Sequence, residues 1–257
     1  MDSRNGDLLA QVATVPRNWL YNFFRINNEW LAWLNRAIEL KVSDNWLEAN
    51  TRQAIGDVQR FRDDNDAALA SYNAALALFQ HVGSRLGEAN TRQAIGDVQQ
   101  FRKDNDAALA SYNAALALFQ LVGDRLGEAN TRQAIGDVQR FRDDNDAALA
   151  SYNAALALFQ HVGSRLGEAN TRRALGLLEL ENGNIERAMQ FLEQAVNLHH
   201  QIGSEYSVAV DYWYFAVALD EKGMVAEAKR CAEIAAPIFE KMGLPYAERM
   251  REILGAP

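Results

Sequence analysis

The chain has little of the residues that mark a disulfide framework, a metal centre or a broken backbone. It contains one cysteine, four prolines and four histidines in 257 residues. A single cysteine excludes an internal disulfide framework and fits a reducing compartment. No apolar run approaches the ~20 residues that cross a bilayer, and the N-terminal residues lack the charged-then-apolar pattern of a signal peptide. We therefore expect a cytoplasmic protein.

Basic regions and catalytic patterns are also absent. The net charge is −8 and no segment is strongly basic, so a nucleic acid is not an expected partner. The adjacent His199 and His200 point to different sides of a helix, which we interpret as a solvated helix end rather than a metal site. Paired carboxylates such as Asp63 and Asp64 are explained by helix capping, and no Ser, His and Asp combination or glycine-rich phosphate loop is present. We expect no enzyme activity, no cofactor and no metal.

What the chain has instead is internal repetition. The segment Glu48 to Arg92 recurs letter for letter at Glu128 to Arg172, and a near copy begins at Glu88, shifted by forty residues. The near copy differs at four positions: Gln100 for Arg60, Lys103 for Asp63, Leu121 for His81 and Asp124 for Ser84. A fixed period of this size is typical of a solenoid, in which each repeat buries its apolar face only against its neighbours. Recent duplication and deliberate construction both explain the identity, and both argue against a single catalytic pocket inside the repeats.

Each repeat contains two helical patterns. In the first copy an apolar stripe at helical spacing predicts a first helix: Leu47, Ala54, Val58 and Phe61. A cluster of N-cap candidates follows at residues 63–66. The second helix has one apolar face: Ala68, Tyr72, Ala75, Phe79 and Val82. Gly83 is the expected left-handed C-cap. The pattern predicts a repeated αα-hairpin and an all-α fold.

These hairpins resemble the tetratricopeptide repeat. The small and aromatic residues of that family's motif fall on Gly56, Ala68, Tyr72 and Ala75, and the same places in the next copy are Gly96, Ala108, Tyr112 and Ala115. The period of about forty exceeds the family's ~34 residues, and the family's aromatic at position four is replaced by Arg52, Arg92, Arg132 and Arg172. The resemblance implies a right-handed α-solenoid of stacked antiparallel helix pairs, similar to arrays in bacterial signalling and regulatory proteins.

The expected domain organisation has three parts. Residues 1–45 form an aromatic-rich, degenerate N-terminal hairpin, and residues 246–257 form a C-terminal capping helix. The five repeats between them span 46–85, 86–125, 126–165, 166–205 and 206–245. Pro237 interrupts the last second helix and is expected to kink it. Cys231 lies in the same helix and is expected to be a small core residue.

The N-terminal hairpin concentrates aromatic residues. The candidates for docking or assembly at this end are Trp19, Phe23, Phe24, Trp30 and Trp33. We favour a cap over the open apolar end of the solenoid, because every solenoid has an end to cover. Docking of a protein, a second copy or a membrane surface is the alternative.

The resemblance also implies a groove lined by the first helix of each repeat, at positions two, five, nine and twelve. Position two supplies Asn50, Asn90, Asn130 and Asn170. Position five supplies Gln53, Gln93, Gln133, Arg173 and Trp213. Positions nine and twelve supply Asp57, Asp97, Asp137, Arg60 and Arg140. Repeated amides can donate to and accept from the backbone of an extended peptide, and the aspartates disfavour acidic ligands.

The expected function is therefore that of a non-catalytic adaptor or scaffold that binds a protein or peptide in this groove. One alternative is a self-assembling structural module, a homo-oligomer that joins head to tail through its aromatic N-terminal end. A second alternative is a regulatory subunit of a larger signalling or enzyme complex.

Overall fold

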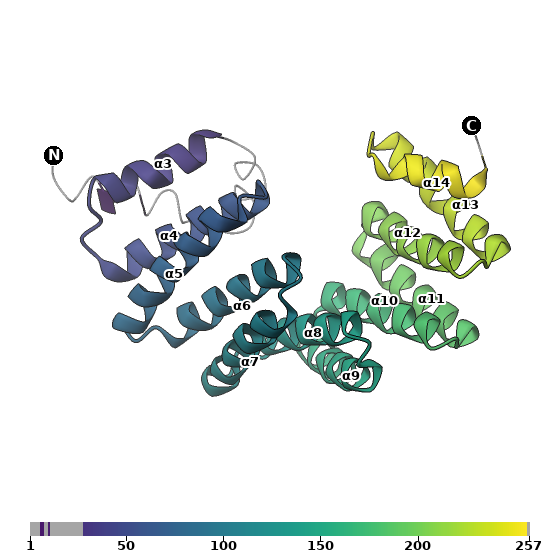
Figure 1. The fold of residues 1–257 in the computed structure, drawn as a ribbon, viewed down its shortest axis with the longest axis horizontal. Coiled ribbons are helices and arrows are strands. Elements are labelled where there is room, and N and C mark those ends of the chain that lie inside the picture. The colour runs from purple at the N-terminus through teal and green to yellow at the C-terminus, as the bar shows by residue number, and fades with distance from the viewer. Residues whose placement is uncertain (1–5, 8–9, 11–27, 256–257) are drawn as a thin grey trace. The chain divides into compact units, whose positions relative to one another are not determined.

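The computed structural model describes residues 6–7, 10 and 28–255. Over these residues the secondary structure is helical, with no strand (Figure 1). The helices up to the third repeat are α3 (Asn28–Glu39), α4 (Asn45–Phe61), α5 (Asn65–His81), α6 (Arg85–Phe101), α7 (Asn105–Val122) and α8 (Arg125–Phe141). The rest are α9 (Asn145–Val162), α10 (Arg165–Glu181), α11 (Ile185–Ile202), α12 (Glu205–Glu221), α13 (Val225–Lys241) and α14 (Tyr246–Leu254). The chain divides into two compact parts, Met1–Ala134 and Ile135–Pro257.

Capping residues mark both ends of α5. Asp64 caps α5 by accepting a hydrogen bond from the backbone N–H of Ala67 at 3.3 Å. Gly83 follows α5 with φ of +69°, a left-handed conformation that glycine adopts without steric cost. The predicted N-cap cluster and the predicted C-cap glycine are both confirmed.

Glycines let neighbouring helices approach each other, both within a hairpin and between successive hairpins. A Cβ added at Gly56 in α4 would lie 2.6 Å from Cε1 of Tyr72 in α5 of the same hairpin. One added at Gly87 in α6 would lie 2.3 Å from Cδ1 of Phe79 in α5 of the preceding hairpin. Both aromatic rings are fully buried. Packing therefore requires a small residue at both positions, as the sequence pattern predicts for Gly56.

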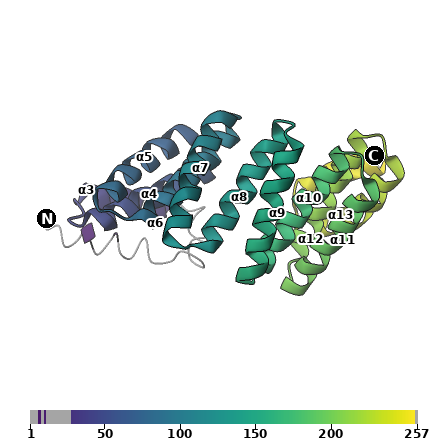
Figure 2. The ribbon, with the colours of Figure 1, turned by 90° about the horizontal axis from the view of Figure 1, so that it is seen from below.

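Within each part, the first helices of successive repeats also contact each other. In the N-terminal part α4 contacts α6, and in the C-terminal part α10 contacts α12. Among the described residues of either part, the second helices make no comparable contact with one another. Figure 2 shows the helices of each part stacked as neighbouring antiparallel pairs. The first helices therefore line the more closely packed side of each part.

Three expectations about individual residues are corrected or refined. α13 runs unbroken through Pro237; the carbonyl four residues earlier, which loses its partner, belongs to the exposed Glu233. Phe61, expected in the apolar stripe of the first helix, is 42% exposed because α4 ends there. Val82 lies beyond the end of α5 and is 39% exposed.

Cys231 is buried in α13, and burial raises the pKa of its thiol to about 11. It is a small core residue, as predicted, and not an ionised nucleophile at neutral pH.

The expected division into an N-terminal hairpin, five repeats and a C-terminal helix stays a prediction. α3 is helical where the second helix of the N-terminal hairpin is expected. The first helix of that hairpin, with Trp19, Phe23 and Phe24, lies outside the described residues.

Candidate functional site

The predicted groove asparagines lie on the first helices with their side chains partly or fully exposed. Asn50 donates to the carbonyl of Trp46 in its own helix at 2.7 Å. In the described part of the chain no hydrogen bond engages the side chains of Asn90, Asn130 or Asn170. These three amides present donors and acceptors that the fold leaves unused.

The groove glutamines are more deeply set. Gln93 accepts a hydrogen bond from the hydroxyl of Thr131 at 3.2 Å. The side-chain carbonyl of Gln53 is buried without a partner among the described residues. Gln133 is half-buried on α8.

The groove aspartates form hydrogen bonds within the fold that the sequence did not indicate. Each accepts a hydrogen bond from the buried tyrosine of its own hairpin, at 2.7 Å for Asp57 and Tyr72, 2.9 Å for Asp97 and Tyr112, and 2.7 Å for Asp137 and Tyr152. A buried hydroxyl without a hydrogen-bond partner costs free energy. These carboxylates therefore hold the buried tyrosine of each copied repeat in place.

Burial perturbs two of these carboxylates. Burial raises the pKa of Asp97, although Arg60 and the hydroxyl of Tyr112 oppose the shift. Burial likewise raises the pKa of Asp137, against the opposing hydrogen bond from Tyr152. A nearby cation would therefore stabilise the ionised form of each of these two carboxylates.

Arginines connect the first helices of successive repeats. Arg60 on α4 pairs with Asp97 on α6 at 3.2 Å, and Arg140 on α8 pairs with Glu181 at the end of α10 at 3.0 Å. Arg60 is the more open of the two, since its side chain is 41% exposed and that of Arg140 is 15% exposed.

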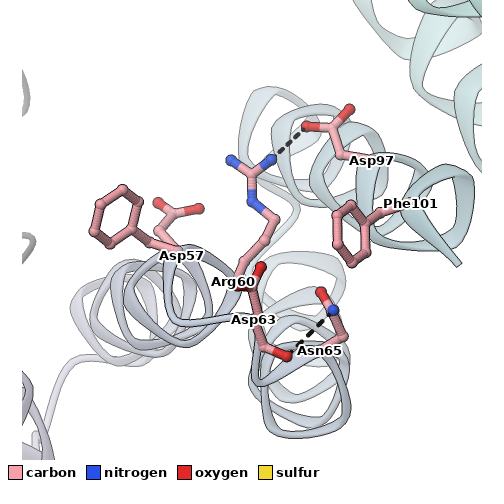
Figure 3. A pocket seen from close by; sticks show the side chains of 7 residues that line it. Asp57, Arg60, Asp63, Asn65, Asp97 and Phe101 are labelled. Atoms are coloured by element: carbon pink, nitrogen blue, oxygen red, sulfur yellow. Dashed lines mark hydrogen bonds and ion pairs between the residues drawn. The ribbon is translucent and has the colours of Figure 1, made fainter. Parts of the chain in front are cut away.

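A pocket of about 320 Å³ opens beside Arg60, where α4 ends, α5 begins and α6 ends. Its lining combines charged, amide and aromatic side chains: Asp57, Arg60, Phe61, Asp63, Asn65, Asp97 and Phe101. Figure 3 shows Arg60 extending toward Asp97, with Phe101 and Asn65 beside the same space. Of these residues, Asp57, Arg60 and Asp97 were predicted from the sequence, and the structure brings them together.

The other four lining residues, Phe61, Asp63, Asn65 and Phe101, were not predicted as site residues from the sequence. Phe101 is 66% exposed, and no aromatic or cationic partner covers its ring among the described residues. Asp63 sits in the turn after α4 with φ of +59°. The signal available in the sequence was the phenylalanine that ends α4, α6 and α8 next to a charged turn.

In the C-terminal part, the predicted groove residue Arg173 belongs to a chain of ionisable residues that extends into the core. Arg173 on α10 pairs with Asp211 on α12 at 2.9 Å, and the other oxygen of Asp211 contacts Nδ1 of His199 at 2.7 Å. Asp211 and His199 are fully buried. The interpretation of His199 as part of a solvated helix end was therefore wrong, whereas His200 is exposed.

The tryptophans predicted as binding or docking residues differ in how far their side chains are buried. Trp213 is half-buried, and its ring meets those of Tyr214 and Tyr246 edge-on, with centroid distances of 4.8 and 5.4 Å. Trp30 is buried against Leu34 and other residues of α3 and α4, which fits a capping role. Trp33 is 45% exposed.

Among the described residues, no group of three or more His, Cys, Asp or Glu is arranged to hold a metal ion. None of the described helices is both long and apolar enough to span a bilayer.

Comparison with solved structures finds the same fold in several proteins. The apo form of RapI has a TM-score of 0.72 at 12% identity, over 98% of both chains. The Rap conjugation gene regulator of plasmid pLS20, solved with the Phr* peptide, has a TM-score of 0.67 at 15% identity, over 99% of this chain and 77% of that chain. BtubC (BKLC) from P. vanneervenii has a TM-score of 0.64 at 15% identity, over 95% of this chain and 93% of that chain. These likenesses establish the fold and nothing finer.

A search of curated proteins gave no match. A family model for the tetratricopeptide repeat matches residues 47–120, 87–161 and 129–201, which together cover more than half of the chain. The expected all-α solenoid class is confirmed by these matches and by the helices described above. The chain belongs to the tetratricopeptide-repeat family.

Proposed function

We propose that this protein is a non-catalytic adaptor or scaffold that binds a protein or peptide along the first helices of its repeats. The observation that supports this most directly is the set of amides at position two. Asn90 and Asn130 recur at one place on successive first helices of the N-terminal part, and Asn170 takes the same repeat position in the C-terminal part. Their side chains make no hydrogen bond with the described residues. Amides in such a register can pair with the backbone N–H and C=O groups of an extended chain.

The hydrogen-bonded aspartates and tyrosines of the repeats support the same proposal. Because each aspartate already accepts a hydrogen bond from a buried tyrosine, the aspartate side chains of the groove are held in place before a ligand binds. A preformed floor lowers the ordering cost of binding. The Rap regulator of plasmid pLS20, which has this fold, was solved with a bound peptide. We place the activity in the cytoplasm, where the single buried cysteine needs no disulfide partner.

The test compares two faces of the same repeats. Peptides are first selected from a displayed random library on the full chain, and their dissociation constants are measured by fluorescence anisotropy. The inner-face variant carries Asn90→Ala, Asn130→Ala and Asn170→Ala. The matched control changes exposed asparagines of the second helices, namely Asn73→Ala, Asn113→Ala and Asn153→Ala.

We expect the inner-face variant to bind at least about tenfold more weakly, since each lost hydrogen bond contributes ~0.5–1.5 kcal/mol. The outer-face control should bind as the parent does. Equal binding by all three proteins, with unchanged circular dichroism, would contradict the proposal.

Self-assembly is a second candidate because Trp33 and Trp46 are 45% and 53% exposed near the start of the array. Large exposed indoles often mark interaction surfaces. Light scattering coupled to size exclusion across a concentration series distinguishes the two functions. A mass that grows with concentration, and returns to one chain in a Trp33→Gln, Trp46→Gln variant, would favour assembly over peptide binding.

A further inference from the structure

The pocket at the end of α4 has an excess of negative charge around an uncovered aromatic ring. Its lining holds three carboxylates, from Asp57, Asp63 and Asp97, and one guanidinium, from Arg60. The nearby Arg102 is itself paired with Asp66 on α5. A net charge of this sign in a partly enclosed space disfavours an anion and favours a second cation.

The three carboxylates differ in what they already bind. Asp57 and Asp97 accept hydrogen bonds from Tyr72 and Tyr112, and Asp97 also pairs with Arg60. Asp63 has no ion-pair partner among the described residues, and its backbone carbonyl, rather than its carboxylate, receives the bond from Asn65 at 3.3 Å. A free carboxylate and a free ring, that of Phe101, therefore lie on the wall of one pocket.

We propose that this pocket binds the charged end of an arginine or lysine side chain presented by a polypeptide partner. The proposal rests on the proposed binding function and names the side-chain class that one part of the surface selects. The incoming cation lies against the face of Phe101 and pairs with Asp63, while its stem runs out along the exposed stem of Arg60. Cation–π contact and a carboxylate together are a common way to hold guanidinium and ammonium groups.

Size and charge distinguish this ligand from the alternatives. A volume of about 320 Å³ lies at the small end of the range for ligand sites, which fits one side chain rather than a cofactor. An acidic side chain would meet three carboxylates with one arginine already engaged. An apolar side chain would strip water from those carboxylates without replacing their hydration.

The third repeat supplies an internal comparison. It carries the same five residues from α8, its turn and α9, namely Asp137, Arg140, Phe141, Asp143 and Asn145. The next helix, however, offers Leu177 and Glu181 where α6 offers Asp97 and Phe101. There Glu181 pairs with Arg140, whose guanidinium also lies 5.2 Å from the centroid of Phe141. The third repeat thus lacks equivalents of Asp97 and Phe101 beside the same five residues, so it serves as the control.

The second copy of the repeat shows how to reverse the charge without disturbing the backbone. Lys103 stands where the first copy has Asp63, and the two residues share the same left-handed conformation, with φ of +62° and +59°. Asp63→Lys is therefore a substitution that this chain already accommodates at an equivalent turn. Asp143→Lys makes the same change in the third repeat, where Asp143 also has φ of +59°.

The experiment uses the full chain with 4-fluorophenylalanine at position 101, so that fluorine NMR observes this ring among near-identical repeats. The probes are blocked tripeptides, acetyl-Gly-X-Gly-amide, with arginine, lysine, glutamate or leucine as X. We expect saturable shifts with arginine and lysine, with a dissociation constant on the order of millimolar, and none with glutamate or leucine. Asp63→Lys should weaken arginine binding about fivefold or more, and Asp143→Lys should leave it unchanged.

Equal shifts with the glutamate probe, or arginine binding unaffected by Asp63→Lys, would overturn the proposal. A second pair of variants repeats the test without changing charge. Phe101→Leu should abolish binding of a fluorine-labelled arginine probe, whereas Phe141→Leu, at a ring that is 65% exposed, should not. Failure here leaves the amide test of the proposed function intact, because that test changes neither Asp63 nor Phe101.

Discussion

The buried chain of Arg173, Asp211 and His199 provides a demanding test of the energetics of this array. All three residues depart from the repeated sequence together. At the matching places the preceding repeat has uncharged side chains: Gln133, Thr171 and Phe159. Thr171 donates its hydroxyl to the carbonyl of Gly167 in its own helix at 2.8 Å. The repeated sequence thus supplies uncharged residues for all three places.

The first perturbation is Asp211→Thr alone. Asp211 and His199 are 0% exposed, whereas the side chain of Arg173 keeps 19% exposure. Removing one partner of a buried ion pair costs ~3–5 kcal/mol, because the other charge is left uncompensated. Arg173 can turn its guanidinium toward water, so we expect the lower end, a loss of about 3 kcal/mol in the free energy of unfolding.

The second perturbation rebuilds the uncharged version with Arg173→Gln, His199→Phe, Ser207→Gly and Asp211→Thr. The glycine is needed because a Cβ at Gly167 in the preceding repeat would lie only 2.2 Å from Cδ1 of Phe159. Replacing a buried ion pair with well-packed uncharged residues is often neutral or stabilising. We therefore expect this variant to regain the parent's free energy of unfolding within about 1 kcal/mol, or to exceed it.

Urea unfolding followed by circular dichroism measures the overall change. Hydrogen exchange with mass spectrometry locates it, because the sequence from Arg173 onward is unique and its peptides can be assigned. Faster exchange in α11 and α12 should accompany Asp211→Thr and disappear in the four-residue variant. A loss below about 1 kcal/mol for the single change, or no recovery in the four-residue variant, would refute the assignment of a coupled buried ion pair.

Two further predictions concern the repeated packing and its electrostatics. Gly96→Ala should lower the free energy of unfolding by about 1–2 kcal/mol in urea titrations. The added Cβ would lie 2.6 Å from Cε1 of Tyr112, and the cost of this overpacking exceeds the ~1 kcal/mol that alanine gains in helix propensity. A stabilised variant would show that the ring of Tyr112 moves freely. For Glu128, burial raises the pKa, but hydrogen bonds from Gln120, Arg125 and Arg132 outweigh burial and hold the pKa below its usual value. Glu128→Gln should therefore lower the free energy of unfolding by about 1 kcal/mol at pH 7. This difference in unfolding free energy should shrink as the pH falls below ~4.3, because the ionised form of Glu128 then stops contributing to stability. A difference that grows on acidification would show that the pKa of Glu128 is shifted upward.

The helix pairs and their caps could be predicted because they depend on residues close together in the sequence. Asp64 and Gly83 act on backbone groups within a few residues, so the local pattern contains the whole interaction. The close fit of Gly56 and Tyr72 also lies within one hairpin. Periodicity and turn chemistry were sufficient for all of these.

The contacts that join one repeat to the next could not be predicted in the same way. Helical periodicity places Arg60 on a face of α4, but it does not show that Asp97 of the following repeat accepts its guanidinium. The same limit hid the burial of His199, which depends on Asp211 in the next helix. Most positions from Arg173 onward depart from the repeated sequence, so the departures at His199, Ser207 and Asp211 did not stand out.

This dependence on the following repeat has a consequence for how near-identical copies acquire different functions. The first and third copies share every residue from the end of the first helix through the turn, yet only the first faces Phe101 and Asp97. The third faces Glu181, which pairs with Arg140. A site built from two consecutive repeats is thus specified by the pair, so duplication of one repeat yields a new site wherever its neighbour differs. Substitutions on the last turns of α6 and α10 should therefore change ligand preference more than equal substitutions within the copied segment of α4 or α8.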